Sequence, residues 1–436
     1  MKSINIFWFR RDLRLHDNAG LYYALKQNFP VIPIFIFDKH ILDVLEDKAD
    51  RRVNFIYNAI IELQNELLIT GSSLEIYHGL PEQIFEQLMS KYDIKEVFTN
   101  DDYEPYAIER DQVVRNILNR KKILFKAYKD QVIFDKDEII KDDHTPYTVF
   151  TPYSKRWKTK LKDFYLKPYP SEKLSVNFFN QSPKIIPSLE SMGFKKTDTV
   201  FPLKIFSEQL ISDYYLQRNF PAANGTSRLS VHLRFGTISI RELAGNAVRL
   251  NETFLNELIW RDFYQAILWH FPKVGNHKAF KPEYENIKWR NNEEEFARWC
   301  NGQTGYPIVD AGMRELNQTG FMHNRVRMIV ASFLCKHLLI DWRWGEAYFA
   351  QKLLDFDLAS NNGGWQWASG SGCDSAPYFR IFNPYLQTKK FDKDLIYIKK
   401  WVPEFQEFTY PTPIVEHEFA RKRCLAVYAD AIKNLH

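Results

Sequence analysis

The chain has 436 residues, of which 45% are hydrophobic and 26% are charged, and its formal net charge is +5. This length and balance are typical of a globular protein with two or three domains and a large core. No apolar run approaches the length of a membrane span, and nothing at the N-terminus resembles a signal peptide, so we expect a soluble, cytoplasmic protein.

The cysteines and the distribution of charge further narrow the class of protein. Cys300, Cys335, Cys373 and Cys424 lie far apart without a C-x-x-C pair, so we predict neither a metal site nor a disulfide framework. Residues 1–128 carry 17 Lys and Arg against 19 Asp and Glu, whereas the rest of the chain carries 42 against 35. The basic excess in the C-terminal two-thirds permits a polyanion such as nucleic acid to dock there.

The first 129 residues predict an α/β domain built on a doubly wound parallel sheet, because short apolar runs alternate with helical patterns. The predicted strands are residues 4–9, 31–38, 74–79 and 96–100, and the predicted helices are 20–26, 51–68, 81–89 and 108–119. No G-x-G-x-x-G follows the first strand, so a dinucleotide fingerprint is absent. Arg10, Arg11 and Arg14 follow it instead, and charge alone predicts that they lie on the surface.

Residues 130–197 are irregular and rich in proline and charge, which predicts a long interdomain linker. From residue 198 to 436 the helical period dominates and predicts an all-α domain. Its predicted helices are residues 206–217, 240–250, 255–271, 293–300, 308–316, 324–339 and 344–354.

Residues 355–384 fit no single period. Residues 361–364 read Asn-Asn-Gly-Gly, which is turn chemistry, and a glycine-rich loop lets the backbone come close to a ligand. Trp365 and Trp367 offer flat faces beside it. The plainer alternative is a tight interhelical turn with tryptophans in the core.

Residues 225–230 read GTSRLS, and this turn concentrates three hydroxyls and Arg228. The cluster can hold a phosphate, although one hydroxyl would suffice for an ordinary helix cap.

Residues 255–271 predict a helix with two faces. Leu255, Ile259, Phe263 and Ile267 recur every four residues and form a core stripe. The other face combines a carboxylate, an indole and a guanidinium, which suits either a ligand or a surface with one snorkelling tryptophan. This face consists of Glu257, Trp260, Arg261 and Tyr264.

In the HNRVRM segment, spacings of three and four place Asn324, Arg327 and Met328 on one helix face, with Arg325 pointing elsewhere. We expect Arg327 to pair with Asp355.

These segments, together with WFRRDLRLHDN near the start, TPYTVFTPYSKRWK in the linker and PTPIVEHEFAR near the end, resemble the DNA photolyase and cryptochrome family. The resemblance covers nearly the whole chain and is strongest to the class I cyclobutane pyrimidine dimer photolyases. It implies an antenna-chromophore domain at the N-terminus and a helical FAD-binding catalytic domain at the C-terminus.

The family resemblance implies functions for individual residues. The residues implied to bind FAD are Tyr214, Thr226, Ser227, Arg228, Leu229, Ser230, Arg261, Arg327, Asp355, Asp357 and Asn361. Those implied to contact the dimer or the DNA are Glu257, Trp260, Asn324, Arg325, Met328, Trp367 and Arg380, with Lys155, Arg156 and Lys390 near the DNA. Trp365, Trp342 and Trp299 match the family's electron-transfer chain from the flavin to the surface.

The implied reaction is blue-light repair of pyrimidine dimers in DNA by electron transfer from photoexcited reduced FAD, carried out by a monomer. The alternatives are a cryptochrome-type photoreceptor without repair, a (6-4) photolyase, and a flavoprotein that has lost light chemistry. Asn361 beside the flavin and the absence of a long C-terminal tail favour repair over a cryptochrome, and Asn324 disfavours the (6-4) lesion. A second, antenna chromophore is possible, and in the family it is a deazaflavin, flavin mononucleotide or folate. Tyr106 and Ala107 replace the Asn-Glu pair of folate-binding members, so the folate contacts are not reproduced, and a deazaflavin or flavin mononucleotide antenna, or none, remains open.

Overall fold

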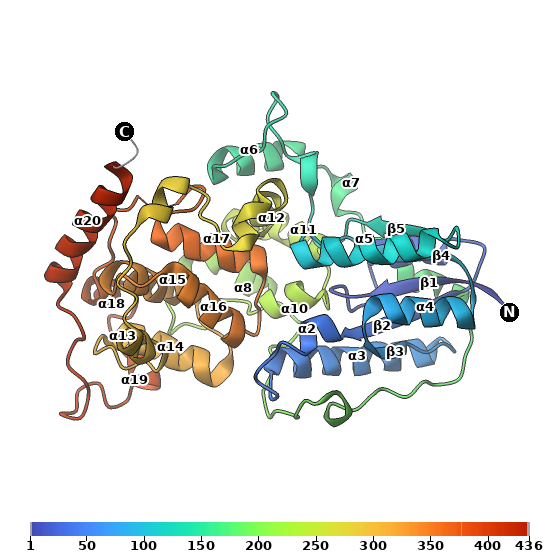
Figure 1. The fold of residues 1–436 in the computed structure, drawn as a ribbon, viewed down its shortest axis with the longest axis horizontal. Helices are drawn as coiled ribbons and strands as arrows, with labels where there is room; N and C mark the ends of the chain where they lie inside the picture. Colours follow the sequence, from blue (N-terminus) through green and yellow to red (C-terminus); the bar gives the residue numbers. More distant parts are fainter. Residues whose placement is uncertain (1, 376, 434–436) are drawn as a thin grey trace. The chain divides into compact units, whose positions relative to one another are not determined.

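The computed structural model describes residues 2–375 and 377–433 (Figure 1), and these form two compact units built from alternating parts of the chain. The first unit comprises Met1–Asp135, Lys160–Phe206 and Arg228–Arg249, and the second comprises Lys136–Thr159, Ser207–Ser227 and Leu250–His436. The chain therefore leaves each unit and returns to it. A single pair of domain boundaries, such as residues 129 and 197, cannot describe this division.

The first unit contains a five-stranded, fully parallel sheet with the strand order β3-β2-β1-β4-β5, which confirms the predicted α/β class. The strands are β1 (Ser3–Phe9), β2 (Val31–Asp38), β3 (Glu75–Gly79), β4 (Asp93–Asn100) and β5 (Leu124–Tyr128). Four of them were predicted. The edge strand β5 was missed because only one of its five side chains is buried, so its sequence shows no apolar run.

Helices cover both faces of this sheet, as the apolar strands require. The helices are α1 (Ala19–Leu25), α2 (Lys39–Leu42), α3 (Arg51–Ile69), α4 (Pro81–Lys91) and α5 (Pro105–Asn119). Apolar side chains of α4 and α5 pack with Ile4, Ile6 and Trp8 of β1. Helix α1 packs against β1 and β4, where a Cβ on Gly20 would lie 2.8 Å from the Thr99 carbonyl oxygen.

Arg14 is buried, Arg10 and Arg11 are half-buried, and all three are ion-paired, so the prediction of surface charges was wrong. Arg14 is 4% exposed and contacts Asp130 at 2.7 Å, and Asp130 also contacts Arg241 at 2.7 Å. Arg241 lies on α11 (Ile240–Leu250), far along the chain. These buried pairs fix the returning segment 228–249 to the sheet unit, and a lone arginine in the sequence does not reveal its partners.

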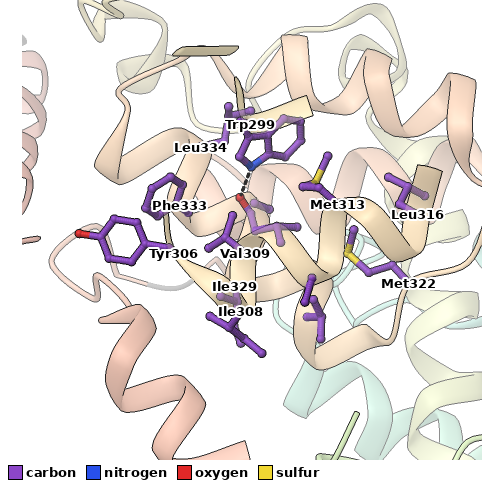
Figure 2. Packing of buried hydrophobic residues seen from close by; sticks show 14 of the residues in the cluster. Trp299, Tyr306, Ile308, Val309, Met313, Leu316, Met322, Ile329, Phe333 and Leu334 are labelled. Carbon is purple, nitrogen blue, oxygen red and sulfur yellow. Dashed lines mark hydrogen bonds between the residues drawn. The ribbon is translucent and has the colours of Figure 1, made fainter. Parts of the chain in front are cut away.

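The second unit is helical, as predicted. Its α-helices are α6 (Phe150–Lys160), α8 (Glu208–Ser212), α9 (Tyr214–Gln217), α12 (Glu252–His270), α13 (Glu293–Cys300), α14 (Pro307–Thr319), α15 (Asn324–Ser332), α16 (Trp342–Lys352), α17 (Leu358–Ser369), α18 (Pro384–Phe391), α19 (Ile396–Trp401) and α20 (His417–Lys433). Figure 2 shows the core around Trp299, whose indole Nε1 donates to the carbonyl oxygen of Val330 at 3.2 Å. Among the described residues, no helix is long and apolar enough to cross a membrane.

Three local predictions about the second unit were wrong. Residues 361–364 lie inside helix α17 rather than in a turn, because Asp357 caps the helix by accepting from the Ser360 N–H at 3.0 Å. The predicted helix 324–339 changes after Ser332 into the π-helical turn η6 (Phe333–His337). The supposedly irregular linker contains helix α6, whose inner face buries Tyr153 and Trp157.

Candidate functional site

Helix α12 presents the two faces that its sequence predicts. Its core stripe is buried, with Ile259 and Phe263 fully so. On the other face Glu257, Trp260, Arg261 and Tyr264 are all half-buried. A face of this chemistry that is neither fully exposed nor fully buried is a good candidate for a ligand-binding wall.

Glu257 has a partner that the sequence did not reveal. Arg218, just after helix α9, forms an ion pair with the Glu257 carboxylate at 2.5 Å, and its guanidinium also lies over the ring of Tyr214, 5.3 Å from the centroid. Burial raises the pKa of Glu257, while the positive charges of Arg218 and Arg325 oppose that rise. Arg218 lies in a short irregular connection, where no periodicity marks it.

Trp260 is held on one ring face by Phe150, the first residue of helix α6. The two rings are parallel within 2° and their centroids are 3.7 Å apart. The Phe150 backbone N–H donates to the Asp374 carboxylate at 3.0 Å, which fixes the start of α6. Only one face of the Trp260 indole is therefore left for another flat ring.

The first turn of α15 carries the next predicted group. Asn324 is exposed and Met328 is half-buried. Arg325 does not point away from them: its guanidinium lies 3.6 Å from the Met328 sulfur, 2.6 Å from the Asn219 oxygen and 4.4 Å from the Phe391 ring centroid. The long arginine arm reaches across three residues, which the spacing of Cα atoms alone does not show.

The predicted pairing of Arg327 with Asp355 is confirmed. The guanidinium donates to both carboxylate oxygens at 2.9 and 3.1 Å, and Arg327 Nε also donates to the Met322 carbonyl oxygen at 2.8 Å. Asp357 is buried and accepts from the Gln265 amide at 3.2 Å, which connects α17 to α12. Two carboxylates and an arginine thus form a fixed polar wall.

Asn361 lies on α17 and is only 9% exposed. Its amide donates to the backbone carbonyl of Glu346 at 3.1 Å, and the neighbouring Asn362 amide donates to the Glu346 carboxyl group at 2.9 Å. His277 contacts the same carboxyl group at 3.2 Å. Burial raises the pKa of Glu346, although these hydrogen bonds oppose the rise. Nothing in the sequence pattern marks Glu346.

The three tryptophans predicted to carry electrons are all in the core. Trp365 is 2%, Trp342 1% and Trp299 0% exposed. Trp365 meets Trp299 edge to face, with ring centroids 6.1 Å apart. Trp299 cannot be the surface end of an electron chain because it has no exposed surface, so that part of the prediction was wrong. The electron-transfer role of the three residues stays a prediction.

The remaining predicted residues of the second unit fall in different surroundings. Trp367 is half-buried against the core, and Arg380 is exposed. Lys155, Arg156 and Lys390 are exposed as well. The Trp367 side chain belongs to the same helix as Asn361, but its predicted position opposite Trp260 stays a prediction.

The GTSRLS segment lies where the chain passes from one unit to the other. Thr226 and Ser227 belong to the second unit, while Arg228, Leu229 and Ser230 belong to the first. Arg228 adopts a left-handed backbone conformation with φ of 53°. Leu229 is buried and Ser230 begins the short helix α10 (Ser230–Phe235). The predicted phosphate contacts of this segment stay predictions.

A separate polar cluster lies in the first unit, at the carboxyl ends of the strands. The Tyr106 hydroxyl donates to Asp38 at the end of β2 at 2.5 Å, and burial raises the pKa of Tyr106. The guanidiniums of Arg10 and Arg110 lie 5.0 and 4.9 Å from the ring centroid of Trp8. Ala107 is buried. Ligands of open parallel sheets bind at this edge, so it is where a second chromophore is expected.

Comparisons with known proteins agree with this arrangement. Residues 5–173 match the family model for DNA photolyase, and residues 254–409 match the model for the FAD binding domain of DNA photolyase. A deoxyribodipyrimidine photo-lyase of Synechococcus sp. is 39% identical over 97% of this chain and 96% of its own length. The enzyme of that name from Escherichia coli is 36% identical over 99% of both chains.

Solved structures are similar over nearly the whole chain. A bacterial class III photolyase from Agrobacterium tumefaciens has a TM-score of 0.88 at 32% identity, covering 99% of this chain and 98% of its own. An archaeal photolyase from Sulfolobus tokodaii with two FAD molecules has a TM-score of 0.83 at 37% identity, covering 99% and 100%. A cryptochrome from Synechocystis sp. has a TM-score of 0.84 at 26% identity, covering 98% and 99%.

The parallel α/β unit, the helical unit with its polar wall and these sequence matches define a class of light-dependent flavoenzymes. The chain belongs to the DNA photolyase and cryptochrome family. Its helical second unit carries the family's FAD-binding domain.

The residues present fit a large polar cofactor such as FAD. The side-chain oxygens of Asn256 and Gln265 on α12 are buried and have no hydrogen-bond partner among residues 2–375 and 377–433. Buried acceptors in this position are costly unless a ligand donates to them. The polar wall of Arg327, Asp355 and Asp357, together with the Asn361 amide, supplies further donors and acceptors for a flavin ring.

Proposed function

We propose that the protein is a deoxyribodipyrimidine photo-lyase that uses blue light and reduced FAD to split cyclobutane pyrimidine dimers in DNA. We further propose that it works as a monomer in the cytoplasm. One observation carries the proposal. Helix α12, whose half-buried face carries Glu257 and Trp260, packs against α17, and both the capping residue Asp357 and Asn361 of α17 are buried. An aromatic and carboxylate wall for a base thus lies beside a polar wall for a flavin.

The protein's own contribution is binding and orientation. Reduced FAD, when bound, supplies the light-driven electron that opens the cyclobutane ring and takes it back afterwards. Trp260, fixed from behind by Phe150, would stack on the flipped-out dimer with one free face. Glu257 would accept a hydrogen bond from a pyrimidine N–H, and its ion pair with Arg218 stabilises the negative charge of the carboxylate. Asn361 and the Arg327–Asp355 pair would fix the flavin ring.

Repair of one defined lesion tests the proposal. A reduced, FAD-loaded protein is illuminated with blue light in the presence of an oligonucleotide that contains one cis-syn thymine dimer, and recovery of thymine absorbance is followed against a dark control. We expect light-dependent recovery. Glu257→Gln removes the carboxylate charge that pairs with Arg218 and that would strengthen the hydrogen bond to the dimer. The variant should therefore lower the repair yield per photon.

The similarity to the Synechocystis cryptochrome supports a second candidate function, that of a light sensor without repair. The same experiment separates the two. Bound and photoreducible FAD without dimer repair would reject the photo-lyase proposal and favour the sensor. An otherwise identical oligonucleotide with a (6-4) lesion should stay unrepaired, since Asn324 stands where a histidine pair would serve that substrate.

A further inference from the structure

Lys336 is an amine in the core of the second unit. It lies in the π-helical turn η6 and is 1% exposed. The buried thiols of Cys335 and Cys424 are its neighbours, and its Nζ donates to the backbone carbonyl of Arg380 at 2.9 Å. Burial lowers the pKa of Lys336.

The burial of a lysine in this core requires a physical explanation. A buried ammonium is costly unless it is paired and hydrogen-bonded, and a methionine of similar length would fill the same space without that cost. The contact with the Arg380 carbonyl is therefore the feature that distinguishes Lys336 from an apolar side chain.

Residues 377–382 form the turn that carries Arg380, here called the Arg380 turn. Tyr378 stacks on Tyr428 of α20 with the rings parallel within 15°, and Ile381 packs on the same cluster. The Arg380 N–H donates to the Pro377 carbonyl oxygen at 2.9 Å. The turn is thus anchored through its backbone and its flanking side chains, while the Arg380 side chain stays exposed.

We propose that Lys336 is a positioning residue for DNA binding, because it fixes the Arg380 turn so that the guanidinium meets a phosphate of the lesion-bearing strand. This inference rests on the proposed function, in which the protein binds DNA. A preformed turn lowers the ordering cost that a mobile arginine would incur on binding. An exposed arginine on a fixed backbone is also well suited to phosphate geometry.

The test measures the affinity of the FAD-loaded protein for the dimer-containing oligonucleotide as a function of salt. Lys336→Met should weaken binding by about fivefold to tenfold and lower the slope of log K against log salt by about one. Arg380→Ala should do the same, and the double variant should be no worse than Arg380→Ala alone. Amide hydrogen exchange over the Arg380 turn should accelerate in Lys336→Met, whereas bound FAD and its photoreduction should not change.

Two further variants keep the test decisive. Lys288→Met removes an exposed lysine of the same unit and should leave both affinity and exchange over the turn as in the wild type. If Lys336→Met does not fold, Lys336→Gln replaces it, because the glutamine amide is polar but its arm is one bond shorter.

Normal affinity and salt slope in a folded Lys336 variant, or losses that add to those of Arg380→Ala, would overturn the positioning role alone. A wild-type chain that neither binds nor repairs the dimer would overturn the proposed function and this inference with it.

Discussion

Trp365 tests the electron-transfer prediction at the level of one side chain. It is almost fully buried and contacts both Phe349 and Trp299. Trp365→Phe replaces an oxidisable indole by a phenyl ring, so light-driven reduction of bound oxidised FAD should be largely lost. The smaller ring should also cost roughly 1–2 kcal/mol of stability. The measurement is the bleaching of flavin absorbance under blue light with an external reductant.

Trp344→Phe is the matched control, because Trp344 is a half-buried tryptophan of the same unit that packs on Phe296. Its photoreduction should remain close to that of the wild type. Undiminished photoreduction in Trp365→Phe would remove Trp365 from the electron chain.

At this scale the sequence predicted a pair whose two members each lie in a recognisable motif. Arg327 of HNRVRM and Asp355 at the start of residues 355–384 were expected to pair, and they do. Arg218, Phe150 and Glu346 were missed as partners of Glu257, Trp260 and Asn362. Each is brought in by tertiary packing from another element, and a single sequence carries no period or spacing that connects them.

The packing of α12 on α17 depends on a glycine. A Cβ added to Gly363 would lie 2.3 Å from ring carbons of Tyr264, whereas a Cβ on the adjacent Gly364 meets no described residue within 4 Å. We expect Gly363→Ala to destabilise the protein by about 1–3 kcal/mol through overpacking and to weaken FAD retention. Thermal unfolding and the ratio of bound flavin to protein measure the two effects.

Gly364→Ala provides the internal comparison for the same helix. Alanine is favoured over glycine in a helix by roughly 0.5–1 kcal/mol, so this variant should be neutral or stabilised. Equal behaviour of the two variants would show that contact with Tyr264 does not limit the packing of α17.

The same glycines explain why this element was predicted as a turn. Glycine and asparagine are poor helix formers in isolation, so residues 361–364 favour a turn locally. The Asp357 cap and the close approach of Tyr264 override that preference. The long amphipathic helices were predicted well because their periodicity and their packing agree.

The stability of the whole chain should depend on pH through His337. This residue is buried, hydrogen-bonded to His417 at 2.9 Å, and stacked on Phe333. Burial, with the nearby His417, Arg423 and Lys336 in second place, lowers the pKa of His337 to about 3. The unfolded chain, with a histidine pKa of about 6.5, therefore binds a proton that the folded chain does not bind between these values.

Because the unfolded state binds more protons in that window, the free energy of unfolding should fall as the pH falls below about 6.5. The slope from this one group is about 1.4 kcal/mol per pH unit. Denaturant unfolding between pH 7 and 5 measures it. His337→Gln should flatten the dependence, whereas His144→Asn at an exposed site should not. An unchanged slope in His337→Gln would assign the effect to other groups.

The class of each unit was accessible from the sequence, since strand and helix periods differ sharply. The division of the chain was not, because residues 160–206 and 228–249 return to the sheet unit, and buried pairs of Arg241 with Asp17 and Asp130 hold the second of these segments there. A change in the hydrophobic pattern along the chain shows where helices replace strands. It does not show to which unit a segment belongs.

The interleaved units have a consequence for synthesis on the ribosome. The last piece of the sheet unit, Arg228–Arg249, is translated after two pieces of the helical unit, Lys136–Thr159 and Ser207–Ser227. The sheet unit therefore cannot complete itself when its first 135 residues emerge, because its last piece ends only at Arg249. Its three pieces must wait for one another, so the nascent protein carries an unfinished first half until more than half of the chain has left the exit tunnel.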